Sequence, residues 1–284
     1  MSSRSYAIRL GLRRGWLEFM QSLRASQDIG WYVFTSLGVL GYLYLRRDSE
    51  VAGTDLTVPV VSMPSILAAL IAFGVVAGPA YTLAMQREDG TLLRLKSVPN
   101  GLPGYVVSQV TTPTLGALIQ LPLIIVPSLF LFDGMSGNGL PGWAALVGFI
   151  LLGLVAMMPI GIIIGALVPN TQKVNTWGML PVMTLIGISG IFYPIQALWG
   201  WVQVVAQVFP LYWVGLGLRS AFLPDEAATV EVGDSWRTLE TVLVLGGWAV
   251  VTIALLPIVL NRMARRTSGS QVEAARDQAL QWIK

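Results

Sequence analysis

The sequence predicts an all-α polytopic membrane protein: six transmembrane helices, an N-terminal amphipathic interfacial helix and a re-entrant helical hairpin before the last span. Three observations lead to this fold class. The 284 residues are 54% hydrophobic and only 12% charged, whereas soluble domains carry about 25% charged residues. Apolar runs recur at the roughly 20-residue length that a membrane span needs. Lys and Arg are also distributed unevenly between the segments that connect these runs.

The first element is a basic amphipathic helix over residues 4–26. A basic helix that carries Trp16 and Phe19 is typical of the headgroup plane of a membrane, and a disordered basic leader is the alternative. The apolar residues expected on one side are Tyr6, Leu10, Leu17, Met20 and, at the edge, Trp16. We expect no cleavable signal peptide, because five arginines precede the first apolar run and no small-residue cleavage site follows a short apolar core.

The spans follow from the apolar runs. The six candidates are 29–45, 63–85, 103–132, 141–168, 176–194 and 239–261. The third and fourth are longer than needed, and their four prolines (Pro113, Pro122, Pro127 and Pro159) predict kinks or tilt.

Residues 194–222 are also apolar, but Pro194 and Pro210 interrupt them. Each half is short for a span, so we predict a re-entrant hairpin, which is tolerated where it is buried in protein or lines a cavity. The alternative is one broken span, which gives seven spans and moves the C-terminus to the opposite side.

Charge distribution favours six spans. With the N-terminus inside, fourteen of the 18 Lys and Arg fall in inside segments, as the positive-inside rule requires. Seven spans would divide them evenly. Arg46 and Arg47 are the one local departure. The sequence therefore predicts a single domain over 1–284, made of 1–28 (interfacial helix), 29–261 (six spans) and 262–284 (tail), with both termini cytoplasmic.

Composition excludes several kinds of chemistry. The chain has no Cys and no His, which rules out thiolate or imidazole metal sites and Ser-His or Cys-His nucleophiles. It also has no Gly-x-x-x-x-Gly-Lys-Ser/Thr phosphate loop. We expect no catalytic, cofactor or metal site in this chain and no role for nucleic acid. Gly161-x-x-x-Gly165 predicts close helix packing.

The densest charged stretch between apolar runs is 86–100, with five ionisable residues (Arg87, Glu88, Asp89, Arg94 and Lys96). It predicts a turn at Asp89-Gly90, one to two helical turns with exposed charges, and a stop at Pro99-Asn100-Gly101. Its cations favour the cytoplasmic face. The alternative interpretation is a solvated loop without a function.

Three stretches together resemble the ABC type-2 transporter permease family, the membrane subunits of drug, lipid and polysaccharide exporters. The basic leader is similar to that family's connecting helix. Arg87-Glu88-Asp89-Gly90-Thr91-Leu92-x-Arg94-Leu95-Lys96-x-x-Pro99 resembles its acidic-Gly-Thr-Leu-x-Arg loop. Ser189-Gly190-Ile191-Phe192-Tyr193-Pro194-Ile195, followed by Pro210-Leu211-Tyr212-Trp213 and Leu218-Arg219, resembles the end of its fifth span and its extracellular re-entrant helices.

The resemblance implies a dimeric permease, with itself or a related chain, in the plasma membrane, bound to cytoplasmic subunits that hold ATP and Mg. The loop residues Arg87, Glu88, Asp89, Gly90, Thr91, Arg94 and Lys96 would couple to the ATPase, with Lys173 near the same partner. An amphipathic or hydrophobic cargo, such as a drug or lipid, would pass spans two and five, and the residues that would meet it are Phe73, Tyr81, Trp177, Met183, Phe192 and Tyr193.

Two other functions compete with this interpretation. A membrane-embedded enzyme acting on lipid needs a reactive group at membrane depth, and the absence of His, Cys and buried acids argues against it. A non-transporting scaffold, or the sensor subunit of a signalling complex, stays open from the sequence.

Overall fold

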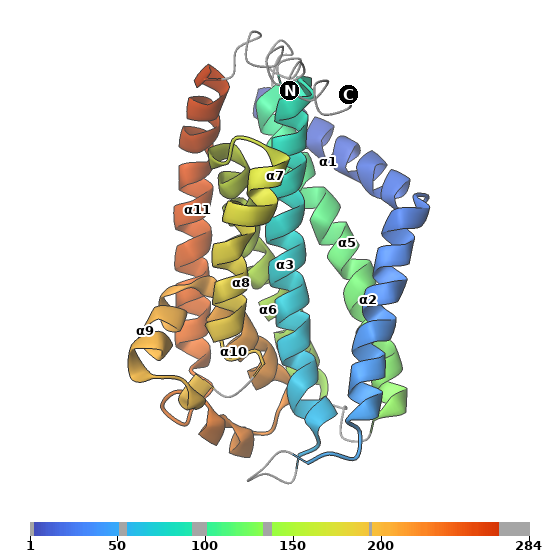
Figure 1. Ribbon diagram of the computed structural model, residues 1–284, viewed down its shortest axis with the longest axis vertical. Helices are drawn as coiled ribbons and strands as arrows, with labels where there is room; N and C mark the ends of the chain where they lie inside the picture. Colours follow the sequence, from blue (N-terminus) through green and yellow to red (C-terminus); the bar gives the residue numbers. More distant parts are fainter. Residues whose placement is uncertain (1–2, 51–55, 93–100, 133–137, 193–194, 267–284) are drawn as a thin grey trace.

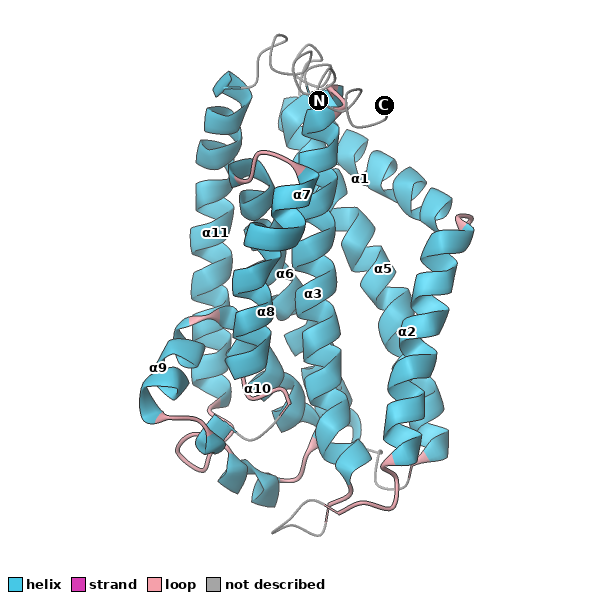
Figure 2. Cartoon of the chain, viewed as in Figure 1, coloured by secondary structure: helices cyan, strands magenta, loops and turns pink. Residues whose placement is uncertain are grey.

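The computed structural model describes residues 3–50, 56–92, 101–132, 138–192 and 195–266. Within these ranges the chain is helical, and its only extended pairing is one isolated bridge between Glu50 and Thr57 (Figure 2). The all-α class is therefore confirmed. The α-helices are α1 (Ser3–Ser22), α2 (Ser26–Leu45), α3 (Val58–Glu88), α5 (Gly101–Leu131), α6 (Gly139–Leu167), α7 (Thr171–Lys173), α8 (Met179–Ile188), α9 (Gly200–Val208), α10 (Pro210–Phe222) and α11 (Thr238–Arg266). A π-helix, Val174–Gly178, joins α7 to α8, and two 3₁₀ helices cover Ile195–Ala197 and Asp225–Val230.

The helices form one bundle with α6 at its centre, packed against α3, α10 and α11. On the other side of α3, α2 and α5 lie together, and α1 packs along α5 (Figure 1). We name the two ends of the bundle by their acidic residues. The Glu88 end is where α3 ends, α7 begins and α11 finishes; the Glu231 end is where α3 begins and where α9, α10 and residues 223–237 lie.

Four helices of the described chain are long and apolar enough to cross a membrane: α3, α5, α6 and α11. They match the predicted spans 63–85, 103–132, 141–168 and 239–261. All four prolines predicted to kink α5 and α6 lie inside helices that continue past them. α2 covers the predicted span 29–45 with 20 residues, but Asp28, three tyrosines and three glycines lower its hydropathy below that of the other four. The count of six spans stays a prediction.

The fifth predicted span, 176–194, is shorter and less regular than expected. Its α-helical part is α8, which has only ten residues and ends at Ile188. The helical path extends backward instead, through the five-residue π-helix and the three residues of α7. The C-terminal stop has a local cause: Gly190 adopts φ of 72°, a left-handed conformation that ends helices and that glycine adopts without strain.

The predicted re-entrant segment, 194–222, forms two helices, α9 and α10, bent by 90° at Phe209. Two tryptophans hold this corner. Trp213 donates its indole N–H to the Gln207 carbonyl at 2.7 Å, and Trp248 donates to the Val208 carbonyl at 2.9 Å. α10 is buried along nearly its whole length. A re-entrant hairpin and one broken span remain alternative interpretations of this pair.

Small residues set the closest helix contacts. The prediction for Gly161 and Gly165 is confirmed, because both face the backbone of α3. A Cβ on Gly165 would lie 2.6 Å from the Ala80 carbonyl oxygen, and one on Gly161 would meet Val76. Only glycine allows α6 to approach α3 this closely.

The buried face of α1 differs from the predicted apolar face. Ala7, Gly11, Gly15 and Phe19 are buried, one helical turn apart, and a Cβ on Gly15 would lie 2.6 Å from Thr111 of α5. Of the residues expected on the apolar side, Tyr6, Leu10, Trp16 and Leu17 are exposed and Met20 is partly buried. The contact of α1 with α5 therefore uses the stripe from Ala7 to Phe19, because Gly11 and Gly15 let the two backbones approach closely. Whether the large residues lie in a headgroup layer stays a prediction.

Candidate functional site

The predicted turn at Asp89-Gly90 is confirmed. α3 ends at Glu88, and Gly90 adopts φ of 78°, a conformation that favours glycine. The Asp89 side chain accepts a hydrogen bond from the Thr91 N–H at 2.8 Å, and helical structure resumes at Thr91. The order Asp-Gly-Thr thus stops one helix and starts the next within three residues.

The end of α3 is bound to the connection between α6 and α7. Glu88 Oε1 accepts a hydrogen bond from the Thr171 N–H at 2.8 Å, and the Thr171 hydroxyl donates to Oε2 at 3.2 Å. Arg87 donates to the Val168 carbonyl at 3.3 Å. Because Val168 caps α6 and Thr171 begins α7, this pair of side chains joins three helix ends.

These contacts correct one expectation about the charged loop. Glu88 is not exposed; it is partly buried against Thr171, whereas Asp89 is exposed. Lys173 is exposed, two residues after Thr171, and its backbone N–H donates to the Asn170 side chain, which caps α7, at 2.9 Å. Arg94 and Lys96 lie outside the described residues, so the geometry of the coupling set extends only to Thr91.

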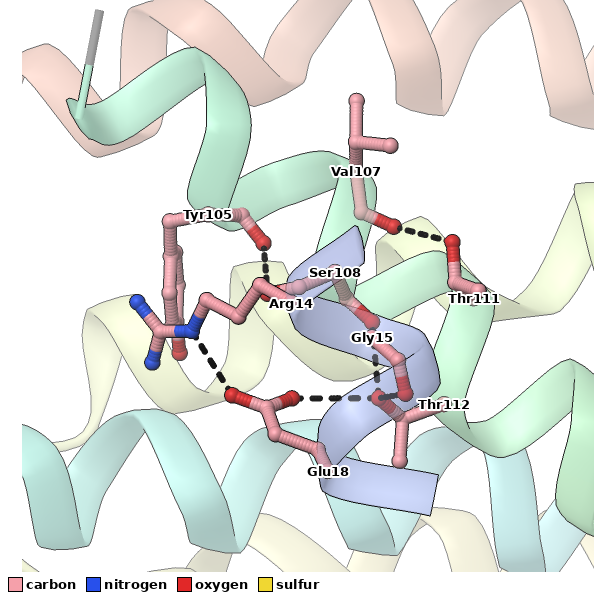
Figure 3. Close-up of polar contacts among 8 residues, drawn as sticks. All are labelled: Arg14, Gly15, Glu18, Tyr105, Val107, Ser108, Thr111 and Thr112. Carbon is pink, nitrogen blue, oxygen red and sulfur yellow. Dashed lines mark hydrogen bonds and ion pairs between the residues drawn. The ribbon is translucent and has the colours of Figure 1, made fainter. Parts of the chain in front are cut away.

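A second polar cluster joins α1 to α5 (Figure 3). Arg14 pairs with Glu18 at 2.7 Å, and the Thr112 hydroxyl lies 3.1 Å from the other oxygen of Glu18. The Arg14 guanidinium also stands over the Tyr105 ring, 5.4 Å from its centre. The cluster is partly exposed, because the Arg14 and Glu18 side chains are each 28% exposed.

The Glu231 end is organised around a buried ion pair. Arg219 Nε lies 2.6 Å from Glu231 Oε1, and the two side chains are only 4% and 5% exposed. The Tyr212 hydroxyl lies 3.4 Å from the second oxygen of Glu231. Gln196 donates to the Glu231 backbone carbonyl at 2.7 Å. A charge that is buried this deeply is stable only when it is paired and hydrogen-bonded.

The ion pair also holds separate helices together. Arg219 Nη1 donates to the Ser65 hydroxyl of α3 at 3.2 Å and to the Gly190 carbonyl at 3.3 Å. The two pieces of the third motif, Ser189-Gly190 and Leu218-Arg219, therefore meet in space. Arg219 lies in the Glu231 end, but inside the protein rather than at its surface.

The predicted cargo residues do not form one cluster among the described residues. Phe73 and Tyr81 lie on α3, Trp177 on the π-helix, Met183 on α8 and Phe192 just after it, and all five are exposed. Tyr193 lies outside the described residues. Exposure alone does not mark a cargo path, since a membrane helix exposes apolar side chains to lipid as readily as to a substrate. Phe73 lines a cavity between α2, α3 and α5.

Sequence reasoning missed several residues of these contacts, among them Thr171, Glu231 and Ser65. Thr171 and Ser65 are ordinary small polar residues in sequence. Glu231 stands in an acidic segment that looks solvated. The available signal was the lone arginine, Arg219, within an apolar stretch, because such a cation requires a buried acceptor.

A bundle of long apolar helices with charged joints at its ends defines a multi-pass membrane protein. The family model described as ABC-2 family transporter protein matches residues 48–256. This range covers most of the chain, and the chain belongs to that family. The matched range begins after α2. The basic leader, which resembles the family's connecting helix, therefore lies outside it. A search among curated proteins finds none that matches. The family places the chain as a membrane permease subunit of an ABC transporter, in which a separate subunit binds ATP.

Proposed function

We propose that the chain is the permease subunit of an ATP-driven exporter in the plasma membrane, working as a dimer with itself or a related chain. Its cargo is amphipathic or hydrophobic, such as a drug or a lipid. ATP and Mg bind the partner subunit, which contacts the 86–100 loop. The observation that supports this most is the joint formed by Arg87 and Glu88 with Val168 and Thr171.

The joint supports coupling because it connects the loop to two helices at once. Glu88 ends α3, and Thr171 begins the helical path that leads through the π-helix to α8. A displacement of the loop by the ATPase therefore acts on α3 and α8 together. These helices correspond to spans two and five and carry Phe73, Tyr81 and Met183. Packed helices transmit such a displacement as rigid bodies.

Orientation follows from charge. We assign the Glu88 end to the cytoplasm, because the arginines of α1, those at the end of α11 and Arg87 of the charged loop all lie at this end. This assignment puts both termini in the cytoplasm and the buried Arg219–Glu231 pair at the outer end. A cysteine at exposed Asp234 that labels only from the cytoplasm would reject it.

Two variants separate binding of the ATPase from transmission. Asp89→Asn removes an exposed charge, keeps an oxygen that can accept from the Thr91 N–H, and leaves the Glu88–Thr171 contact in place, so we expect weaker binding of the ATPase subunit. Glu88→Ala breaks the joint, so we expect the complex to assemble and hydrolyse ATP while cargo transport falls. The double change Glu88→Lys with Asp89→Lys should show both defects. Complex recovery, ATPase rate and transport into vesicles are measured in parallel, with Glu240→Lys, on an exposed site of the Glu231 end, as control.

The class itself is tested by purifying the tagged chain from its native membrane in mild detergent. A stoichiometric ATP-binding protein with ATPase activity supports the exporter. A clean homomer without ATPase activity contradicts it and favours the scaffold or sensor alternative.

A further inference from the structure

A cavity of about 290 Å³ lies between α2, α3 and α5. Its walls come from residues 31–35 of α2, 70–78 of α3 and 113–121 of α5, which are inner parts of three predicted spans. The volume is close to the lower limit for small-molecule pockets, roughly 300 Å³. It therefore has room for one end of a lipid-sized molecule, with the remainder outside.

The cavity has a buried wall and an exposed mouth. Ile71, Gly116 and Leu121 are buried at the wall, whereas Trp31 and Phe73 are exposed at the mouth. Because Trp31 and Phe73 are exposed apolar side chains on two predicted spans, α2 and α3, we infer that the mouth opens toward the bilayer. The lining residues include no Asp, Glu, Lys or Arg, which disfavours a charged headgroup because its charge would stay unpaired.

One polar atom at the wall lacks a partner. Gln120 lines the cavity and is 9% exposed. Its amide nitrogen donates to the Ser36 hydroxyl at 3.0 Å and lies 3.5 Å from the Tyr32 carbonyl oxygen. We assign the amide with its nitrogen toward Tyr32, because the flipped amide would place its oxygen against the Tyr32 carbonyl oxygen, and two acceptors do not bond to each other. Among the described residues, Oε1 is buried and accepts no hydrogen bond, which is rare for a buried acceptor.

We propose that this cavity binds the hydroxyl-bearing end of a neutral amphiphile, with the hydroxyl donating to Gln120 Oε1 and the apolar body packing on Trp31 and Phe73. Long-chain alcohols, sterols and diacylglycerols share this chemistry. The molecule is either a resident bilayer lipid or cargo. The proposal concerns binding alone, and it does not rest on the exporter function.

The test uses two matched probes, of which only one can donate a hydrogen bond. One is a long-chain alcohol with a photoreactive diazirine in its chain and a terminal alkyne; the other is its methyl ether. The full chain is reconstituted in phosphatidylcholine nanodiscs, illuminated with each probe, and labelled positions are mapped by mass spectrometry. We expect the alcohol to label α2, α3 and α5 at the cavity about fivefold or more above the ether, the effect of one hydrogen bond to a buried acceptor.

Variants assign the labelling to the cavity. Gln120→Leu should abolish the preference for the alcohol, but it also removes the contact with Ser36 and so alters how α2 packs. Gly74→Leu avoids this problem, because Gly74 lines the cavity and a Cβ there meets no atom within 4 Å. It should reduce labelling by both probes. Gly148→Leu is the matched control, since that exposed glycine of α6 also has open space around it.

Two results overturn the proposal: equal labelling of the wild-type chain by alcohol and ether, or unchanged labelling in Gly74→Leu. Once the site is established, its source is decided by adding the ATPase subunit and ATP. Loss of labelling during turnover identifies the occupant as cargo, and unchanged labelling identifies a resident lipid. Failure of the exporter proposal would leave the probe pair and the Gly74→Leu result intact.

Discussion

The two ends of the bundle hold their helices by different means. At the Glu88 end, the carboxylates of Glu88 and Glu18 are partly exposed, and the contacts run mainly to backbone groups and hydroxyls. At the Glu231 end, Arg219 and Glu231 are sealed from solvent and bind Ser65 of α3, Tyr212 of α10 and the Gly190 carbonyl just after α8. Exposed polar contacts compete with water and contribute little, whereas a buried pair costs much when one member is removed. We therefore expect the polar contacts at the Glu88 end to break at a lower cost in free energy than the buried ion pair at the Glu231 end.

The largest expected effect is at Glu231. Glu231→Gln leaves Arg219 charged and buried without its counter-ion, so the free energy of unfolding should fall by about 3–5 kcal/mol. Unfolding in detergent micelles, followed by intrinsic fluorescence, measures the change. Glu240→Gln, an exposed change at the same end, is the control and should have little effect.

A double variant distinguishes a lost ion pair from a disrupted fold. Arg219→Met combined with Glu231→Leu removes both charges and keeps apolar volume, so it should recover most of the stability lost by Glu231→Gln. If the single variant were as stable as the wild-type chain, the contrast between the two ends would fail.

The second-largest effect is expected where Gly165 of α6 packs against α3. Gly165→Leu places a side chain against the Ala80 backbone, where a Cβ already lies at 2.6 Å from the carbonyl oxygen. We expect a loss of about 1–3 kcal/mol in unfolding free energy, more than any polar contact at this end provides. Gly148→Leu, on the same helix but facing open space, should change the same unfolding curve little. Equal losses from both variants would mean that α6 does not approach α3 as described.

The smallest effect belongs to the α1–α5 cluster. Glu18→Gln removes a partly exposed pair four residues apart on one helix, and such pairs contribute about 0.3–0.5 kcal/mol. The same unfolding measurement, repeated at low and high salt, should show a small difference that shrinks as salt screens the charge. A loss as large as that of Glu231→Gln would show that this end is as rigid as the other.

The features that the sequence predicted correctly are those that can be read from a single segment of the chain. The helices α3, α5, α6 and α11, the turn at Asp89-Gly90 and the approach of Gly161 and Gly165 were all predicted. It went wrong on the exposure of Glu88 and on the regularity of the 176–194 span, and it did not identify the side of α1 that packs against α5. Two of these depend on a neighbouring helix, because Thr171 covers Glu88 and α5 selects the stripe from Ala7 to Phe19. The early end of α8 instead follows from the left-handed Gly190.

The sequence by itself determined that the chain is helical and where its helices run, because an apolar segment in a membrane must satisfy its backbone hydrogen bonds internally. Only the tertiary structure decided which polar residues meet. Glu88 and Thr171 are 83 residues apart, and Gln120 and Ser36 are 84 apart. Such pairs depend on how each helix is rotated and shifted against its neighbours. Hydrophobic periodicity cannot reveal that rotation here, because the lipid-facing side of a membrane helix is as apolar as its buried side.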